Sequence, residues 1–297
     1  MGKNRVDTSN PKTIARLMKE GRGFGEGENY ISWLKVQDVP SLGRSHRIQG
    51  WRTGNRVVHL MSYLELQHFY TVEWDSCVFD YHEQFPLDLE STREIAHRMD
   101  IRHPAMNSRR RTKASHVIVV RAPNIMTTDL LVFYRHDGKT YREARSVKPA
   151  AKLEGKRGER VKEKLRLEMV YWEALGTNWL LVTDEPVNPE HGFGPESLMV
   201  IDKVLAANVE AIHGYYHLHQ FGRLSNQDVE HVNDLLFPQV QERQAGLADL
   251  AKSCDETLRL PAGASLTIAK YLIAHKVWPV DFSQPFHPRR PLALLAT

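Results

Sequence analysis

Three residues from separate segments of the chain, Glu65, Asp129 and Lys148, carry side chains that metal-dependent phosphodiester hydrolysis would use. Such hydrolysis needs a nucleophilic water and relief of the negative charge that develops around phosphorus, and one or two Mg²⁺ ions can provide both. Mg²⁺ prefers hard oxygen ligands and usually takes only a few protein carboxylates. We therefore predict that Glu65 and Asp129 bind Mg²⁺, and that Lys148 contacts the scissile phosphate or orients the attacking water.

The elements expected around these residues would bring two of them side by side. Glu65 falls on an expected helix, Asp129 opens an apolar strand, and Lys148 ends the strand that follows. The segment between Asp129 and Lys148 is long enough for a hairpin, so the aspartate and the lysine are expected on adjacent strands.

Successive side chains of a strand point to opposite faces of the sheet, which shows which neighbours lie on the same face as Lys148. Ser146 shares the face of Lys148, which makes it a candidate site residue. Val147 points into the core, but its backbone carbonyl could still ligate a metal. Glu143 lies three residues before Ser146 and is therefore expected on the opposite face, outside the site.

Each of these residues also has a purely structural interpretation. Ser62 and Glu65 have the spacing of a capping box at the start of a helix. Asp129 could cap a turn, and Lys148 could simply lie at a strand end. Glu168, on an expected long helix, could belong to a solvated face.

The composition is that of a soluble globular protein, with 41% hydrophobic and 26% charged residues. A chain of 297 residues is long enough for two domains. No stretch approaches the roughly 20 apolar residues that span a bilayer, and the N-terminus lacks the apolar region of a signal peptide. Two distant cysteines, Cys77 and Cys254, suit a reducing compartment. We expect a cytoplasmic protein that does not contact membrane.

Basic residues are clustered, although the net charge is only +4. Lysine and arginine neutralise phosphates, so such clusters are candidate contacts with nucleic acid. The segment 108–113 is the densest run, and it could equally be a solvated loop. The candidate DNA-binding residues are Arg44, His46, Arg47, Arg109, Arg110, Arg111 and Lys113.

The first part of the chain predicts an α/β core, with strands alternating with helices. Ser91 and Glu94 predict a capping box, and Asp137–Gly138 predicts a tight hairpin turn. The glycines of the segment 21–27 predict a flexible loop. Helices are expected at 11–20, from 63 onward, at 91–99 and at 152–175, and strands at 56–60, 76–85, 115–121, 129–135, 141–148 and 179–183.

Prolines and glycines cluster at residues 186–195, where we place a domain boundary. The predicted domains are 1–185 and 186–282, followed by a proline- and arginine-containing tail, 283–297. Helices are expected at 196–212, 227–237, 240–254 and 265–275, with a short strand at 277–280. This order favours a winged helix. The spacing of His213, His217 and His219 could suit zinc, but an ordinary surface or interface position is the preferred interpretation for His217 and His219.

Several motifs resemble those of the TnsA family, the endonuclease subunits of heteromeric bacterial cut-and-paste transposases. The resemblance covers residues 14 to about 185 and is looser beyond. It is carried by the segments 19–27, 30–34, 41–48, 64–66, 73–74, 83–87, 128–129, 147–150, 167–168 and 171–172.

This resemblance implies a restriction-endonuclease-like mixed sheet flanked by helices, followed by a mainly helical winged-helix-like domain. It implies Mg²⁺-dependent hydrolysis at the 5′ ends of transposon-end DNA. It also implies two partners, a transposase, TnsB, that cuts the 3′ ends and joins them to the target, and an ATP-dependent regulator, TnsC. By position, Glu65 and Asp129 would be the metal ligands and Lys148 the catalytic lysine, with Glu168 at a further acidic position near the site.

The chain departs from the family at one position. Ser146 stands where relatives carry glutamine and many nucleases of this fold carry glutamate. A serine hydroxyl is a shorter and weaker ligand than a carboxylate, so metal binding would depend on Glu65, Asp129, the Val147 carbonyl and water. The number of bound metal ions is therefore left open.

Two other functions compete with a transposon-end nuclease. One is a catalytically silent DNA-binding scaffold, with Ser146 as the sign of decay. The other is a standalone nuclease of restriction or repair type, which the motifs outside the site disfavour because cutting alone does not need them.

Overall fold

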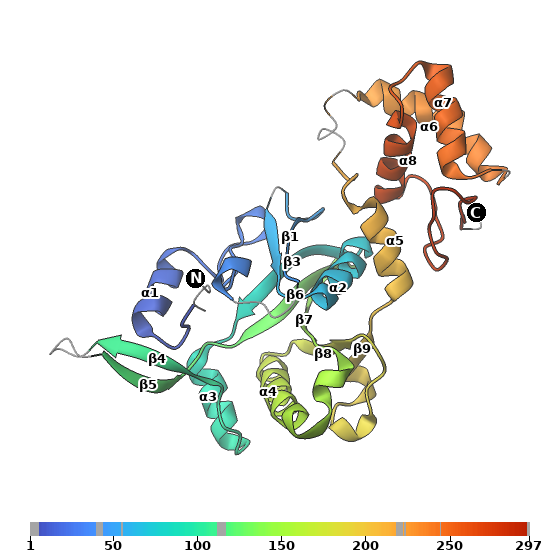
Figure 1. Ribbon diagram of the computed structural model, residues 1–297. Helices are drawn as coiled ribbons and strands as arrows, with labels where there is room; N and C mark the ends of the chain where they lie inside the picture. The colour runs from blue at the N-terminus through green and yellow to red at the C-terminus, as the bar shows by residue number, and fades with distance from the viewer. Residues whose placement is uncertain are drawn as a thin grey trace. The chain divides into compact units, whose positions relative to one another are not determined.

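A computed structural model describes residues 6–39, 44–54, 56–111, 117–217, 222, 224–243 and 245–295 (Figure 1). The chain divides into two compact units, Met1–Ile201 and Asp202–Thr297. The division falls later than the boundary expected at residue 185. The reason is that β9 (Leu198–Val200) pairs in parallel with β8 (Asn178–Thr183) and so belongs to the first unit.

A five-stranded mixed sheet forms the centre of the first unit, in the order β3-β6-β7-β8-β9. Strands β3 (Val78–Pro86), β6 (Thr127–His136) and β7 (Lys139–Val147) are antiparallel, whereas β8 and β9 continue from β7 in parallel. The predicted turn at Asp137–Gly138 is confirmed. Both residues have positive φ, +47° and +72°, as a two-residue hairpin loop of type I′ requires.

Helices cover both faces of this sheet (Figure 1). Helix α4 (Gly155–Ala174) packs Trp172 into a core with Leu131 and Ala144. On α2 (Tyr63–Trp74), Phe69 packs edge-on against Tyr81, with ring centroids 5.4 Å apart. Tyr81 pairs with Val132, the neighbour of Leu131. Because adjacent residues of a strand point to opposite faces, α2 and α4 lie on opposite sides of the sheet.

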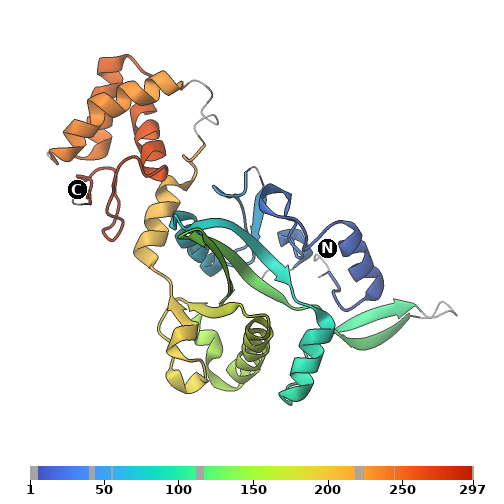
Figure 2. The ribbon, with the colours of Figure 1, turned by 180° about the vertical axis from the view of Figure 1, so that it is seen from behind.

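The remaining α-helices and strands of the first unit lie outside the central sheet. They are helices α1 (Pro11–Lys19) and α3 (Leu89–Arg98), the pair β1 (His46–Gln49) and β2 (Val57–Leu60), and the pair β4 (Ala105–Arg111) and β5 (Val117–Pro123). Figures 1 and 2 show the β4–β5 pair extending away from the sheet as a two-stranded ribbon.

Two local predictions need correction. Helix α3 begins at Leu89, because the side chain of Asp88 caps it by accepting a hydrogen bond from the Ser91 backbone N–H at 2.8 Å. The predicted Ser91 capping box is therefore wrong. The basic residues 109–111 lie in β4, paired with residues 117–119, so their backbone does not form a loop.

The second unit is mainly helical. It contains α5 (Lys203–His213), α6 (Asn226–Gln241), α7 (Leu247–Leu258) and α8 (Ala264–Ala274) around buried residues such as Val209 and Ile268. The helix expected from residue 196 begins at Lys203. Among its described residues, the strand expected at 277–280 is represented by a single bridge between Val280 and Leu294.

The C-terminal tail packs against the second unit. The Pro288 carbonyl accepts a hydrogen bond from the Ala248 N–H at 2.7 Å, and Leu292 is buried. No described helix is both long and apolar enough to cross a bilayer.

Candidate active site

Asp129 and Lys148 meet where the start of β6 lies beside the end of β7. Lys148 Nζ lies 2.6 Å from Asp129 Oδ2 and 2.9 Å from the Val147 carbonyl oxygen. The Val147 backbone N–H also donates to Asp129 Oδ2, at 2.8 Å. The carboxylate is therefore oriented by the backbone of the neighbouring strand as well as by the lysine.

Lys148 keeps its positive charge in this setting. Burial alone would lower the pKa of its ammonium group, but the carboxylates of Asp129 and Glu65 outweigh burial and raise that pKa. The side chain remains 35% exposed. The Lys148 ammonium can therefore contact a phosphate group from solvent while it donates a hydrogen bond to Asp129.

Glu65 lies in the first turn of α2 and is buried. Its carboxylate accepts hydrogen bonds from Ser62 Oγ at 3.0 Å and from the Met61 N–H at 2.8 Å. Ser62 in turn caps the helix by accepting from the Glu65 N–H at 3.1 Å. Ser62 thus caps the helix, but the Glu65 carboxylate takes the Met61 N–H where a capping box would use the Ser62 N–H. These bonds do not exclude a second use of Glu65, because an ionised carboxylate has about four acceptor sites.

Glu65 interacts electrostatically with both Asp129 and Lys148. Burial and the negative charge of Asp129 raise the pKa of Glu65 to about 7, and the positive charge of Lys148 opposes the shift. Such perturbation by burial and a specific charged neighbour is typical of functional sites, although structural networks produce it as well.

Glu168 is buried beside this group and is not part of a solvated face. Its Oε1 accepts from Ser146 Oγ at 2.6 Å and from Thr128 Oγ1 at 2.7 Å, and Trp172 Nε1 donates to Thr128 Oγ1 at 2.7 Å. Burial and the charge of Asp129 raise the pKa of Glu168 to about 7. The Ser146 hydroxyl is thereby engaged with Glu168.

The candidate metal ligands at this site are all oxygen atoms, which are the ligands that Mg²⁺ prefers. The described residues contain no group of three or more His, Cys, Asp or Glu side chains arranged to hold a metal. The candidate ligands are instead the carboxylates of Glu65 and Asp129 and the carbonyl oxygen of Val147. The Lys148 ammonium donates hydrogen bonds to both Asp129 and this carbonyl. Mg²⁺ is commonly held by one or two carboxylates with water completing its shell, so this sparse set is compatible with it.

Gln84, which no sequence pattern singles out as a site residue, contacts this cluster. Its amide Nε2 lies 3.4 Å from Glu65 Oε2, and its Oε1 accepts from Thr127 Oγ1 at 3.2 Å. The residue is 3% exposed. The only available signal was its place inside the motif 83–87, which says nothing about where the amide points.

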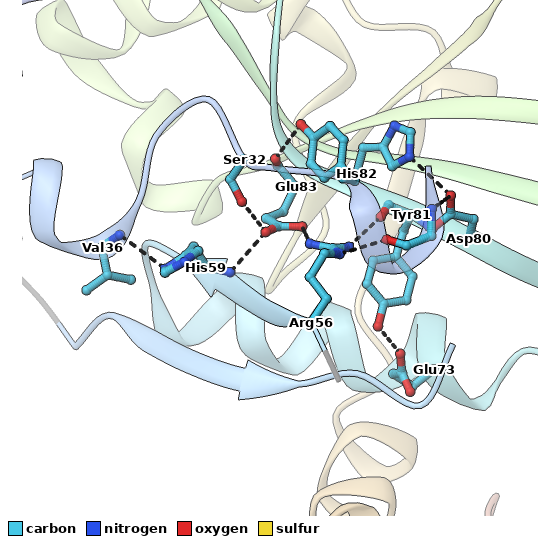
Figure 3. A network of polar contacts seen from close by, with 11 residues as sticks. Ser32, Val36, Arg56, His59, Glu73, Asp80, Tyr81, His82 and Glu83 are labelled. Carbon is cyan, nitrogen blue, oxygen red and sulfur yellow. Dashed lines mark hydrogen bonds and ion pairs between the residues drawn. The ribbon is translucent and has the colours of Figure 1, made fainter. Parts of the chain in front are cut away.

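A buried polar network fixes the strand on one side of Gln84 (Figure 3). Glu83 is fully buried, and its carboxylate accepts from Ser32 Oγ, from the His59 N–H at 3.2 Å and from Arg56 at 2.6 Å. Arg56 also donates to the Gly27 carbonyl at 3.1 Å. The glycine-rich segment expected to be flexible is thus tied to the sheet through Arg56.

The predicted DNA-binding residues that the structure describes come from other elements than this cluster. Arg44 and Arg47 are exposed, with Arg47 and the half-buried His46 on β1. Arg109, Arg110 and Arg111 lie on β4. Lys113 and His219 fall outside the described residues. His213, the first of the three histidines whose spacing could suit zinc, is buried. DNA binding by these residues stays a prediction.

Comparison with known proteins gives one consistent family. The domain described as TnsA-like endonuclease N terminal matches residues 75–184, and the domain described as TnsA endonuclease C terminal matches residues 201–282. The Transposon Tn7 transposition protein TnsA of Escherichia coli is 46% identical over 176 residues, which is 59% of this chain and 58% of that protein. The chain thus spans little more than half the length of that relative in the match.

Proposed function

Since the chain belongs to the TnsA-like endonuclease family, we propose that it is a Mg²⁺-dependent DNA endonuclease that hydrolyses the 5′ ends of a transposon. The observation that carries this proposal is the Asp129–Lys148 pair, which interacts electrostatically with Glu65. Lys148 also donates to the Val147 carbonyl, and Asp129 accepts from the Val147 N–H. We further propose that it works in a complex with the transposase TnsB and the ATP-dependent regulator TnsC.

In this proposal each residue of the site has a separate role in hydrolysis. Bound Mg²⁺, held by Glu65, Asp129 and the Val147 carbonyl, would supply an activated water and neutralise charge at the phosphate. Lys148 places its ammonium against the scissile phosphate, and Asp129 keeps that ammonium in position. Ser146 and Thr128 hold the Glu168 carboxyl beside the site.

The fold supports finer assignments. We propose a restriction-endonuclease-like domain for the first unit. The assignment is supported by a mixed sheet with helices on both faces, and by Asp129 near the start of its interior strand β6. For the second unit we propose a winged-helix-like role in DNA recognition, supported by its consecutive helices.

The β4–β5 ribbon is the proposed DNA-binding element of the first unit. The segment 105–123 contains five lysine or arginine residues and no acidic residue. Its second strand exposes Val117, Ile118 and Val119. A two-stranded ribbon fits the major groove of B-DNA, where arginine can contact phosphates and apolar side chains can contact thymine methyl groups. The remaining proposed contacts are Arg44, His46 and Arg47.

The test uses labelled transposon-end DNA, Mg²⁺ and the partner transposase, with wild type compared to Asp129→Ala. We expect the variant to lose 5′-strand cuts while 3′-strand cuts persist. Asp234→Ala, an exposed aspartate on α6, is the control and should cut like wild type.

Two results would contradict the proposal. If wild type produces no 5′-strand cuts although 3′-strand cuts occur, the protein is a catalytically silent scaffold. If it cuts arbitrary DNA efficiently without the partner, it is a standalone nuclease.

A further inference from the structure

Gln84 has an unusual backbone for its position. Its φ is +50°, a left-handed conformation, although it lies inside β3. The other described non-glycine residues with positive φ lie at helix ends or in turns, and they are Asp100, Asp137, Arg243, Arg259 and Lys276. A residue with a side chain adopts this conformation only where its surroundings impose it, and such outliers cluster at functional sites.

The surroundings of Gln84 do impose it. Before it, Glu83 is anchored by the buried network in Figure 3 and pairs with Leu130. After it, Phe85 pairs with Thr128. These two pairs place Gln84 across from Asp129 in the register of β3 and β6. Gln84 is thus held from both sides next to a candidate metal ligand.

The Gln84 amide joins two elements of the site. Nε2 donates to Glu65 on α2, and Oε1 accepts from Thr127, two residues before Asp129 on β6. An amide is neutral at every pH, so it can restrain a carboxylate without adding charge to a group that already holds Glu65, Asp129 and Glu168.

We propose that Gln84 is a positioning residue, whose amide orients the Glu65 carboxylate toward the ion that Glu65 and Asp129 share. This inference rests on the proposed function, because it presupposes the metal. Residues behind a metal ligand commonly change metal affinity by about 10- to 100-fold when they are removed.

The test compares two substitutions with opposite backbone effects. Gln84→Ala removes the amide and keeps the unfavourable φ, whereas Gln84→Gly removes the amide and relieves it. We expect both variants to bind Mn²⁺, measured by calorimetry on the DNA-free protein, about tenfold more weakly than wild type. Unfolding by urea should nevertheless show that Gln84→Gly is the more stable of the two.

Three further measurements complete the test. Cleavage by both variants should fall at low Mg²⁺ and recover at high Mg²⁺, with DNA affinity unchanged. Thr127→Val, which removes the donor to the amide, should weaken Mn²⁺ binding in the same direction by less. Gln227→Ala, an exposed glutamine on α6, should match wild type.

The inference is overturned if both Gln84 variants bind Mn²⁺ within twofold of wild type. It is also overturned if Gln84→Gly alone keeps wild-type affinity, because the backbone would then be what matters. Asp129→Ala separates this from failure of the proposed function. If Asp129→Ala binds Mn²⁺ as wild type does, the metal site itself is misplaced, whatever the Gln84 variants show.

Discussion

At the scale of single residues, the two hydrogen bonds that Asp129 accepts organise the site. Asp129 Oδ2 accepts from both Lys148 Nζ and the Val147 N–H. The backbone bond fixes the carboxylate even when the lysine moves. Lys148 can therefore be removed without disorganising Asp129, which makes its contribution separable by mutation.

Lys148→Ala should lower the rate of 5′-strand hydrolysis by at least about a hundredfold, as loss of one group that stabilises transition-state charge does elsewhere. Binding to transposon-end DNA, measured by gel shift, should survive. Lys152→Ala, an exposed lysine close by in sequence, should leave both unchanged. Equal loss of hydrolysis and binding would show that Lys148 is a binding residue.

The raised pKa of Glu65 predicts two opposite pH trends. Mg²⁺ needs the ionised carboxylate, so metal affinity should rise as pH increases through about 7. Without metal, the folded state holds a proton that the unfolded state has lost between about pH 4.5 and 7. Glu65 therefore makes the free energy of unfolding fall as pH rises across that window.

Calorimetric titration with Mn²⁺ and urea unfolding, each repeated across pH, check these trends. Glu65→Gln should weaken metal binding at every pH and flatten both dependences. Metal affinity in wild type that is constant from pH 6 to 8 would contradict the assignment.

At the scale of elements, one hairpin decides which residues meet. The two-residue turn at Asp137–Gly138 sets the register in which Leu130 pairs with Arg145. Asp129 consequently lies next to the end of β7, where Lys148 follows. A slip of one residue would turn Ser146 to the other face of the sheet, away from Glu168. The turn therefore positions the site from the far end of the hairpin.

The β4–β5 ribbon carries the element-scale prediction. Arg110→Ala should weaken DNA binding and reduce the slope of log affinity against log salt by about one, because one phosphate contact is lost. Arg98→Ala, an exposed arginine on α3, is the matched control. Fluorescence anisotropy over a range of salt concentrations measures both. Identical salt slopes for wild type and Arg110→Ala would remove the ribbon from the DNA interface.

At the scale of the whole molecule, the two units have separate cores. The first is built around residues such as Leu131 and Leu181, and the second around residues such as Val209 and Ile268. The division after Ile201 coincides with the start of the C-terminal family match at residue 201. The N-terminal family match, residues 75–184, lies within the first unit, and the C-terminal match lies within the second apart from its first residue.

Separate cores predict separate responses to core mutations. Leu181→Ala should destabilise the first unit and Ile268→Ala the second, each by about 2–5 kcal/mol, because both side chains are fully buried. Scanning calorimetry should resolve this as two transitions, of which each variant lowers one. A single transition that both variants lower equally would show that the units unfold as one.

Much of this protein follows from its sequence alone. Strand alternation and the Asp137–Gly138 turn predict that Asp129 and Lys148 meet, and the structure joins them at 2.6 Å. Most helices and strands follow from periodicity, and the family follows from motifs that the domain matches bear out. These features depend on local backbone geometry and on residue type, which a sequence displays directly.

Only the tertiary structure decided the rest. It buried Glu168 against Ser146 and Thr128, gave Gln84 its left-handed backbone, and paired residues 109–111 of β4 with residues 117–119 of β5. Each outcome depends on segments that come together only when the sheet is assembled. A local sequence pattern does not predict these outcomes, because the same residue types are also common on solvated helices, regular strands and loops.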